Sequence, residues 1–183
     1  MDENQKQNAA DLQDRRTLSG MFADRESAEI AYNNLKDKGY SDEDINLIMS
    51  DDTRKKHFAD DDDETEMDTK ALEGAGTGSA IGGTIGAIAG IVAALGTSLL
   101  IPGLGLVIAG PIVAGLAGAG AGGLTGGLIG ALIGSGIPEE KAKVYESGVK
   151  EGKILMNVKP RNEEDGKYFE EDWRKNKGEE VSW

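Results

Sequence analysis

Glycine recurs at every fourth position in two stretches that decide the fold: residues 74–90, GAGTGSAIGGTIGAIAG, and residues 118–134, GAGAGGLTGGLIGALIG. The two glycine ladders are Gly74, Gly78, Gly82, Gly86 and Gly90, and then Gly118, Gly122, Gly126, Gly130 and Gly134. No charged residue occurs from Gly74 to Pro138, although 29% of the 183 residues are charged. A four-residue glycine period gives a helix a smooth face on which another backbone can pack closely. The pattern therefore predicts a packed pair of helices in or on a membrane.

The segment Ile101-Pro-Gly-Leu-Gly105, between the ladders, predicts a chain reversal at Pro102, Gly103 and Gly105. We expect one helix over residues 74–100 and another over 106–135, about 40 Å and 45 Å long, enough for the ~30 Å hydrocarbon core of a bilayer. In water, ladder glycines in place of alanines would cost these helices on the order of 10 kcal/mol. Lipid favours them, because an unpaired peptide group is unfavourable there. The arms either pack together and anchor the chain, or join neighbouring copies into an oligomer.

Strand and helix patterns flank this uncharged block on both sides. Before it, alternating apolar residues predict a strand at 17–23, and Asp24 as N-cap with Gly39 as C-cap predicts a helix over 25–38. A second strand is predicted at 45–49. After the block, Pro138 predicts the start of a helix that ends near Lys150, followed by a strand at 153–158. Neither flank has enough apolar surface to fold alone, so we expect them to form one domain.

The expected fold class is α+β, with a small β-α-β…α-β domain interrupted by a long glycine-zipper α-helical hairpin. This domain would contain a three-stranded sheet and two helices. The expected organisation is a disordered N-terminus at 1–15, the first half of the domain at 16–50, an acidic linker at 51–73, the hairpin at 74–136, the second half of the domain at 137–160, and a charged tail with aromatics at 161–183. The aromatic side chains of this tail predict either folding back onto the domain or binding to a protein partner.

The composition argues against several classes of function. The net charge of −13 is unsuited to nucleic acid, which is bound through clustered Lys and Arg. The chain has no cysteine, and its single histidine, His57, is expected in an exposed linker, so we expect no metal site, no cofactor and no enzymatic activity. The G-x-G-x-x-G match at 118–123 follows from the ladder, because no strand is predicted before it. Residues 1–5, MDENQ, lack the character of a signal peptide, and we expect a cytoplasmic start.

Three segments carry a resemblance to a known family. They are the β-α-β unit with Gly39-Tyr-Ser41, the block from Ile101-Pro-Gly-Leu-Gly105 to Ala109-Gly-Pro111, and Gly136-Ile-Pro-Glu-Glu140 leading to Tyr145, Glu146 and Gly152. Over residues 16–160 the chain resembles the bacterial heat-induced general stress protein family, in which a glycine-zipper hairpin interrupts a small α/β domain. The resemblance implies a stress-associated, non-enzymatic role and brings no catalytic residues.

The leading hypothesis is a non-enzymatic stress-response protein that associates with membrane lipid, or self-assembles as a homo-oligomer, through the hairpin. It would be membrane-associated, with the α/β domain and both termini on the cytoplasmic side. The alternative is a soluble structural protein, oligomeric or filament-forming, with the hairpins buried between subunits.

Overall fold

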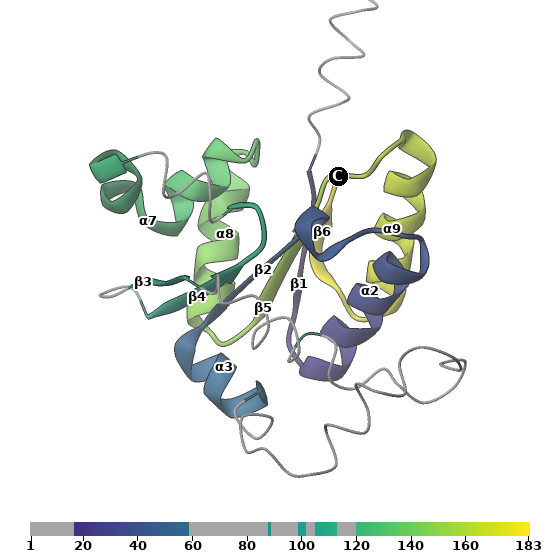
Figure 1. Ribbon diagram of the computed structural model, residues 1–183, viewed down its shortest axis with the longest axis horizontal. Coiled ribbons are helices and arrows are strands. Elements are labelled where there is room, and N and C mark those ends of the chain that lie inside the picture. The colour runs from purple at the N-terminus through teal and green to yellow at the C-terminus, as the bar shows by residue number, and fades with distance from the viewer. Residues whose placement is uncertain (1–16, 59–87, 89–98, 102–104, 113–119) are drawn as a thin grey trace, which may run out of the picture.

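The computed structural model describes residues 17–58, 88, 99–101, 105–112 and 120–183. In these residues an α+β fold is built on one antiparallel sheet of six strands, in the order β3-β4-β2-β5-β1-β6 (Figure 1). The strands are β1 (Leu18–Phe22), β2 (Ile45–Ser50), β3 (Leu99–Ile101), β4 (Leu106–Ala109), β5 (Ile154–Val158) and β6 (Glu179–Ser182). The helices are α2 (Arg25–Asp37), α3 (Asp51–Phe58), α7 (Gly120–Gly134), α8 (Glu139–Lys150) and α9 (Glu163–Lys175), with a short 3-10 turn, η1 (Asp42–Asp44).

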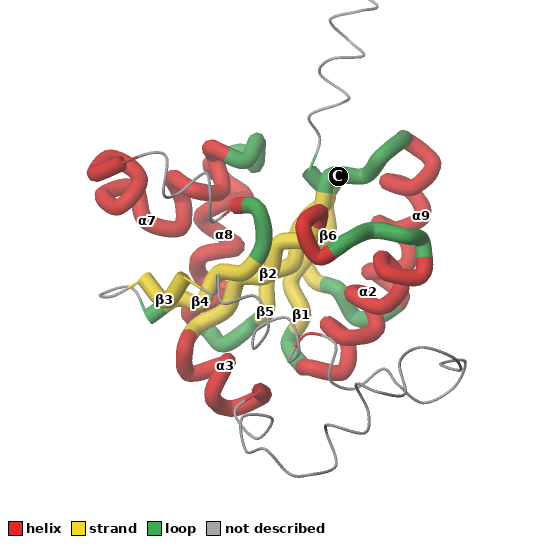
Figure 2. Tube along the Cα trace, viewed as in Figure 1, coloured by secondary structure: helices red, strands yellow, loops and turns green. Residues whose placement is uncertain are grey.

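The two flanks of the uncharged block form the centre of this sheet. β5, which follows the block, lies between β1 and β2, which precede it, and pairs antiparallel with both (Figure 2). Leu155 of β5 is opposite Met21 of β1 on one side and Ile48 of β2 on the other. The three predicted strands are therefore confirmed, and so is the prediction that the two flanks fold together.

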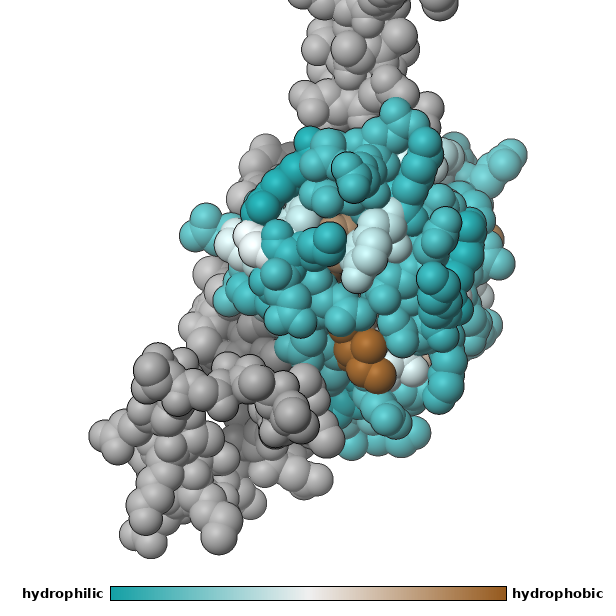
Figure 3. Space-filling model, turned by 90° about the vertical axis from the view of Figure 1, so that its right-hand side faces the viewer, coloured by the Kyte–Doolittle hydropathy of each residue, from teal (hydrophilic) through white to brown (hydrophobic). Residues whose placement is uncertain are grey.

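Helices cover both faces of the sheet, which lies between them in Figure 1. Strand side chains alternate between faces, so Leu18 and Phe22 pack beneath α2 and α9, whereas Met21 packs beneath α7 and α8. The largest side chains under α2 and α9 include Trp173 and Phe169, both fully buried. Viewed from the side of α2 and α9, the described residues present a mostly hydrophilic surface with small hydrophobic areas (Figure 3).

The two predicted helices of the domain are confirmed as α2 and α8. The Asp24 carboxylate accepts a hydrogen bond from the Ser27 N–H at 2.8 Å and so caps the first turn of α2. Gly39, at φ +82°, takes the left-handed conformation that ends the helix. α8 begins directly after Pro138, with Glu139 and Glu140 near its positive end.

The sheet is larger than the predicted three strands, and the C-terminal tail accounts for part of the difference. Residues 163–175 form α9, whose first turn is capped by the Asn162 side chain, which accepts from the Asp165 N–H at 2.8 Å. β6 then pairs with β1 as an edge strand. Phe169 and Trp173 are fully buried, so the tail folds back onto the domain. The predicted acidic linker likewise differs at its start, where residues 51–58 form α3.

The prediction of two helices at 74–100 and 106–135 is wrong around the reversal. Leu99–Ile101 and Leu106–Ala109 are strands that pair with each other, and β4 extends the sheet by pairing with β2. All four residues of β4 are buried. The physical reason is the free edge of β2, whose backbone groups need partners, together with the β-branched residues Val107 and Ile108, which suit a strand.

Candidate functional site

The glycine-rich block is attached to the rest of the domain in its middle and at its C-terminal end. It begins beyond β2 and α3 and ends at α8, and its middle returns to the sheet as β4. The Asp51 N–H at the end of β2 donates to the Gly105 carbonyl at 2.8 Å, which holds the β3–β4 turn against α3. The middle of the block and its C-terminal end therefore belong to the same folded body as the flanks.

Gly110 and Ile112 anchor the chain directly after β4. Gly110 has φ +104°, and a Cβ at this position would collide with the Ile45 carbonyl oxygen and approach Asn46 Cα to 2.9 Å. The Ile112 N–H then donates to Asn46 Oδ1 at 2.7 Å. This backbone can lie so close to β2 only because residue 110 is glycine.

Helix α7 carries the described end of the second ladder. Its backbone is interrupted at Gly127, with φ 56° and ψ −152°. Leu128 and Leu132 are buried against the α8 face of the sheet, whereas Ile133 is 43% exposed. A Cβ added at Gly130 or Gly134 would meet no atom within 4 Å. The ladder face of α7 is thus open at these two glycines, while its leucines hold the helix to the domain.

The first arm also contacts the domain at Ile88, the one residue that the structure describes between positions 59 and 98. Ile88 is fully buried in the cluster beneath α2, and its N–H donates to Glu29 Oε2 of α2 at 3.3 Å. The same carboxylate group is bridged by Arg25 at 3.3 Å. The block therefore touches the layers on both faces of the sheet.

The predicted site residues are only partly described. Gly122, Gly126, Gly130 and Gly134 lie in α7. The other ladder glycines and two of the turn residues lie outside the described residues: Gly74, Gly78, Gly82, Gly86, Gly90, Gly118, Pro102 and Gly103. Gly105 lies in the turn between β3 and β4 with φ +59°. The reversal occurs at the predicted place, but it joins two strands. Close packing of one glycine ladder on the other stays a prediction.

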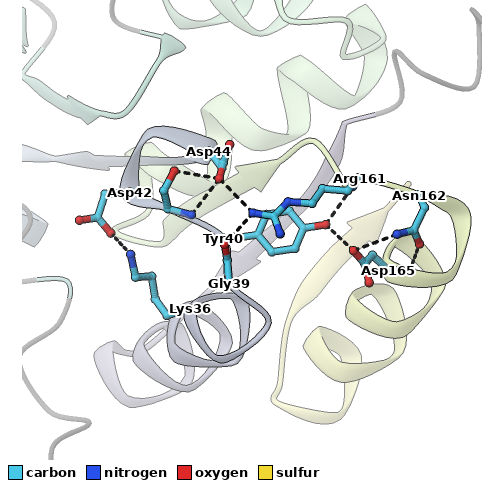
Figure 4. Close-up of polar contacts among 9 residues, drawn as sticks. Lys36, Gly39, Tyr40, Asp42, Asp44, Arg161, Asn162 and Asp165 are labelled. Carbon is cyan, nitrogen blue, oxygen red and sulfur yellow. Dashed lines mark hydrogen bonds and ion pairs between the residues drawn. The ribbon is translucent and has the colours of Figure 1, made fainter. Parts of the chain in front are cut away.

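A polar cluster that sequence reasoning missed joins the first flank to the C-terminal tail (Figure 4). The Tyr40 hydroxyl donates to Asp165 Oδ2 at 2.8 Å and accepts from the Arg161 N–H at 2.8 Å. The Arg161 guanidinium stacks over the Tyr40 ring at 4.2 Å and donates to the Gly39 carbonyl at 2.6 Å. Asp44 lies 3.7 Å from the same guanidinium. The sequence offers only a local signal for it: Asn162, after Pro160, is a suitable N-cap for a helix, and Asp165 lies three residues later.

The chemistry of this cluster, which we call the clamp, is that of a structural contact between the first flank and the C-terminal tail. Burial, together with the hydrogen bond to Asp165, raises the pKa of Tyr40 to about 12, so its hydroxyl keeps its proton at neutral pH. The backbone N–H of Ser41 lowers the pKa of Asp44, which stays ionised beside Arg161. Every charged group of the cluster faces a partner within the domain, and the arrangement holds α9 in place.

The described residues contain no group of three or more His, Cys, Asp or Glu side chains that could hold a metal ion. His57 lies half-buried on α3, where burial and the neighbouring Lys56 lower its pKa, and not on an exposed linker as expected. Within the same part of the chain, no helix combines the length and the apolar character needed to cross a membrane.

Comparisons with known proteins add no family assignment: no protein-family model, curated protein or solved structure gives a significant match to the chain.

Proposed function

We propose that this protein is a non-enzymatic assembly protein whose glycine-rich block associates with membrane lipid or with further copies of the chain. The observation that carries the proposal is the ladder face of α7. Gly130 and Gly134 have open space above them, Ile133 beside them is exposed, and the sequence around them has no charge over the 65 residues from Gly74 to Pro138. A smooth, uncharged, partly apolar surface favours close approach of another backbone or of lipid.

The anchoring of the block supports the same proposal. β4, Gly110 and Ile112 tie one part of it to β2, and α7 ties another part to α8. The block is inserted within one domain, so any part of it that enters a membrane must also return from it, which would leave the domain and both termini on the same face. We place that face in the cytoplasm. The resemblance to the heat-induced general stress proteins supports a role in the stress response.

Assembly without lipid is the second candidate, and a specific contact favours it. Ile88, Leu128 and Leu132 are all buried against the protein's own domain. The block thus already finds protein surfaces on which its apolar side chains can pack. Copies of the block could pack on each other in the same way, which would give a soluble oligomer or filament.

Two leucine substitutions test the proposal. Gly130→Leu and Gly134→Leu place a large side chain where the isolated chain has room, so the domain should keep its far-UV circular dichroism and its unfolding midpoint. Both should weaken assembly or membrane partition, because the glycine face is blocked. Ser147→Leu is the control, since it adds an equal side chain to an exposed position of α8.

The readout is high-speed fractionation in the absence of detergent, followed by carbonate and detergent washes of the pellet. Wild type released only by detergent indicates an integral block, and a soluble particle of defined size indicates assembly between copies. A wild-type chain that is monomeric and does not sediment with vesicles would overturn the proposal, as would unchanged behaviour of both glycine variants.

A further inference from the structure

The two edges of the sheet differ in how they are protected. At one edge, β6 carries Glu179 and Glu180, which bind Lys153 and Lys141 at 2.6 Å and 2.8 Å. The pairing of β6 with β1 shifts register between Ser19 and Met21, and Glu180 has φ 52°. Charges and an irregular backbone are the features that prevent an edge strand from pairing with another chain. β6 is therefore protected against pairing with a strand of another chain.

β3, at the opposite edge, has neither feature. Among the described residues it pairs with β4 alone, in a regular register with Leu100 opposite Val107. Its sequence is Leu99-Leu-Ile101, and the nearest charged residues along the chain are Glu73 and Glu139. A regular apolar edge strand offers unpaired N–H and C=O groups to a further strand.

The charge distribution indicates which strand could bind there. With a net charge of −13, two copies of this chain repel each other, and carboxylates lie along both flanks of the block. The β3–β4 hairpin itself carries no charged residue from Leu99 to Ala109, so two copies that pair along β3 bring no carboxylate of the paired strands together. Antiparallel pairing of one strand with its own copy is self-complementary and needs only a twofold axis.

We propose that two copies of the chain pair antiparallel through β3, with the twofold axis at Leu100, so that their sheets become continuous. The proposal rests on the self-assembly part of the proposed function and assigns its contact. β-strand addition supplies main-chain hydrogen bonds on the outer side of β3, where no described strand pairs with it, and the paired strands themselves carry no charge. In this register Leu100 of one copy is opposite Leu100 of the other, and Leu99 is opposite Ile101.

Cysteine cross-linking tests this register directly, because the chain has no cysteine of its own. Directly opposed residues in an antiparallel pair have Cα atoms about 4.5 to 5.5 Å apart, within the range that a disulfide spans. Oxidised full-length Leu100→Cys should therefore run as a covalent dimer, in both soluble and membrane fractions. Ser182→Cys on β6 and Ile30→Cys on the exposed surface of α2 are the matched controls and should stay monomeric on a denaturing gel.

A charge substitution gives an independent measurement. Leu100→Lys should reduce the dimer population at least tenfold in sedimentation velocity, whereas Ile30→Lys, which adds the same charge at an exposed site, should leave it unchanged. Circular dichroism shows whether both lysine variants are folded. If Leu100→Lys is unfolded, the cross-linking of Leu100→Cys alone decides whether β3 pairs with its copy.

The outcomes separate this inference from the proposed function. A wild-type chain that assembles or binds vesicles, while Leu100→Cys gives no dimer or cross-links no better than Ser182→Cys, overturns the pairing through β3 and leaves the proposed function standing. A product of Leu100→Cys joined to a different protein also overturns it. A wild-type chain that neither assembles nor binds vesicles overturns both.

Discussion

Asn157 of β5 lies directly opposite Ser19 of β1, and neither buried side chain has a hydrogen-bond partner among the residues that the structure describes. They form the middle of a polar row across four strands on the α8 face, flanked by Asn46 of β2 and Ser182 of β6. The outer members are bonded: Asn46 accepts from the Ile112 N–H at 2.7 Å, and the Ser182 hydroxyl lies 3.1 Å from the Tyr145 hydroxyl. In this row, Asn46 and Ser182 therefore have hydrogen-bond partners, whereas Ser19 and Asn157 have none among the described residues.

Replacing Asn157 by leucine should stabilise the domain. The amide is 1% exposed, and leaving it unpaired costs about 1 to 3 kcal/mol, whereas leucine has a similar volume and no polar atoms. We expect Asn157→Leu to raise the free energy of unfolding by roughly 1 to 2 kcal/mol, measured by urea titration with an unchanged m-value.

Asn46→Leu is the matched control on the neighbouring strand, and its effect should have the opposite sign. It removes the acceptor of the Ile112 N–H and so loosens the chain after β4. We expect a loss of about 1 to 2 kcal/mol. If both leucine variants change stability in the same direction, the distinction between paired and unpaired members of the row is wrong.

Tyr40→Phe should weaken the attachment of α9. The hydroxyl accepts from the Arg161 N–H and donates to Asp165. Without it, these two groups must bond to water instead, and we expect the free energy of unfolding to fall by about 1 to 2 kcal/mol. Tyr168→Phe, on α9 itself but 45% exposed, should change stability by less than about 0.5 kcal/mol. Equal effects of the two substitutions in thermal unfolding would contradict the role of the clamp.

The same tyrosine predicts a dependence on alkaline pH. Its pKa rises from the ordinary 10.0 to about 12 on folding, so the folded state holds the proton more tightly. Its contribution to stability is therefore complete below pH 10 and is lost as the pH rises through 12. Burial raises the pKa of Tyr32 and Tyr145 in the same direction. Stability measured between pH 10 and pH 12 should fall less steeply in Tyr40→Phe than in wild type; parallel curves would count against the assignment.

The elements that could be predicted from sequence are those specified by local signals. Asp24 and Gly39 mark both ends of α2, and Pro138 marks the start of α8. The alternation of apolar residues places β1, β2 and β5 within a residue or two. These signals concern neighbouring residues, and the burial of one face then makes the three strands meet.

The elements that could not be predicted depend on contacts between distant residues. The glycine period predicts a helix through Val107 and Ile108, because the free edge of β2 with which they pair lies about sixty positions earlier in the chain and leaves no local signal. The clamp joins Tyr40 to Arg161 and Asp165 in the same way. The aromatic tail is evident in the sequence, but the place of Trp173 beneath the sheet depends on room left at Gly20, far away in the chain.

Gly110→Ala should detach β4 from β2. The residue has φ +104°, which alanine adopts only with strain, and its Cβ would meet the backbone of Ile45 and Asn46, which cannot move without breaking the sheet. We expect a loss of about 2 kcal/mol or more, the range of strained or overpacked positions. Gly105→Ala, at φ +59° with open space around it, should lose only about 1 kcal/mol. Hydrogen exchange of the Val107 and Ile108 amides would localise the change; exchange that is equally slow in both variants would show that β4 stays attached.

The contact between Gly20 and Trp173 can be measured by a double-mutant cycle. A Cβ at residue 20 would lie 2.9 Å from Cε3 of Trp173 and 3.2 Å from Cγ2 of Val181. Alanine would otherwise suit β1 better than glycine, because it restricts the unfolded chain more. Gly20→Ala alone should therefore destabilise the domain by about 1 to 3 kcal/mol through overpacking of the indole.

The same substitution in a Trp173→Leu background has no indole to meet, so its effect should fall to nearly zero or become stabilising. Trp173→Leu itself should lose about 2 to 4 kcal/mol, since it leaves a cavity in the core. The coupling energy of the cycle, about 1 to 2 kcal/mol, reports directly on the packing of α9 against β1. If Gly20→Ala has the same effect in both backgrounds, the tail does not dock through Trp173, and the aromatic residues of α9 become available for a partner after all.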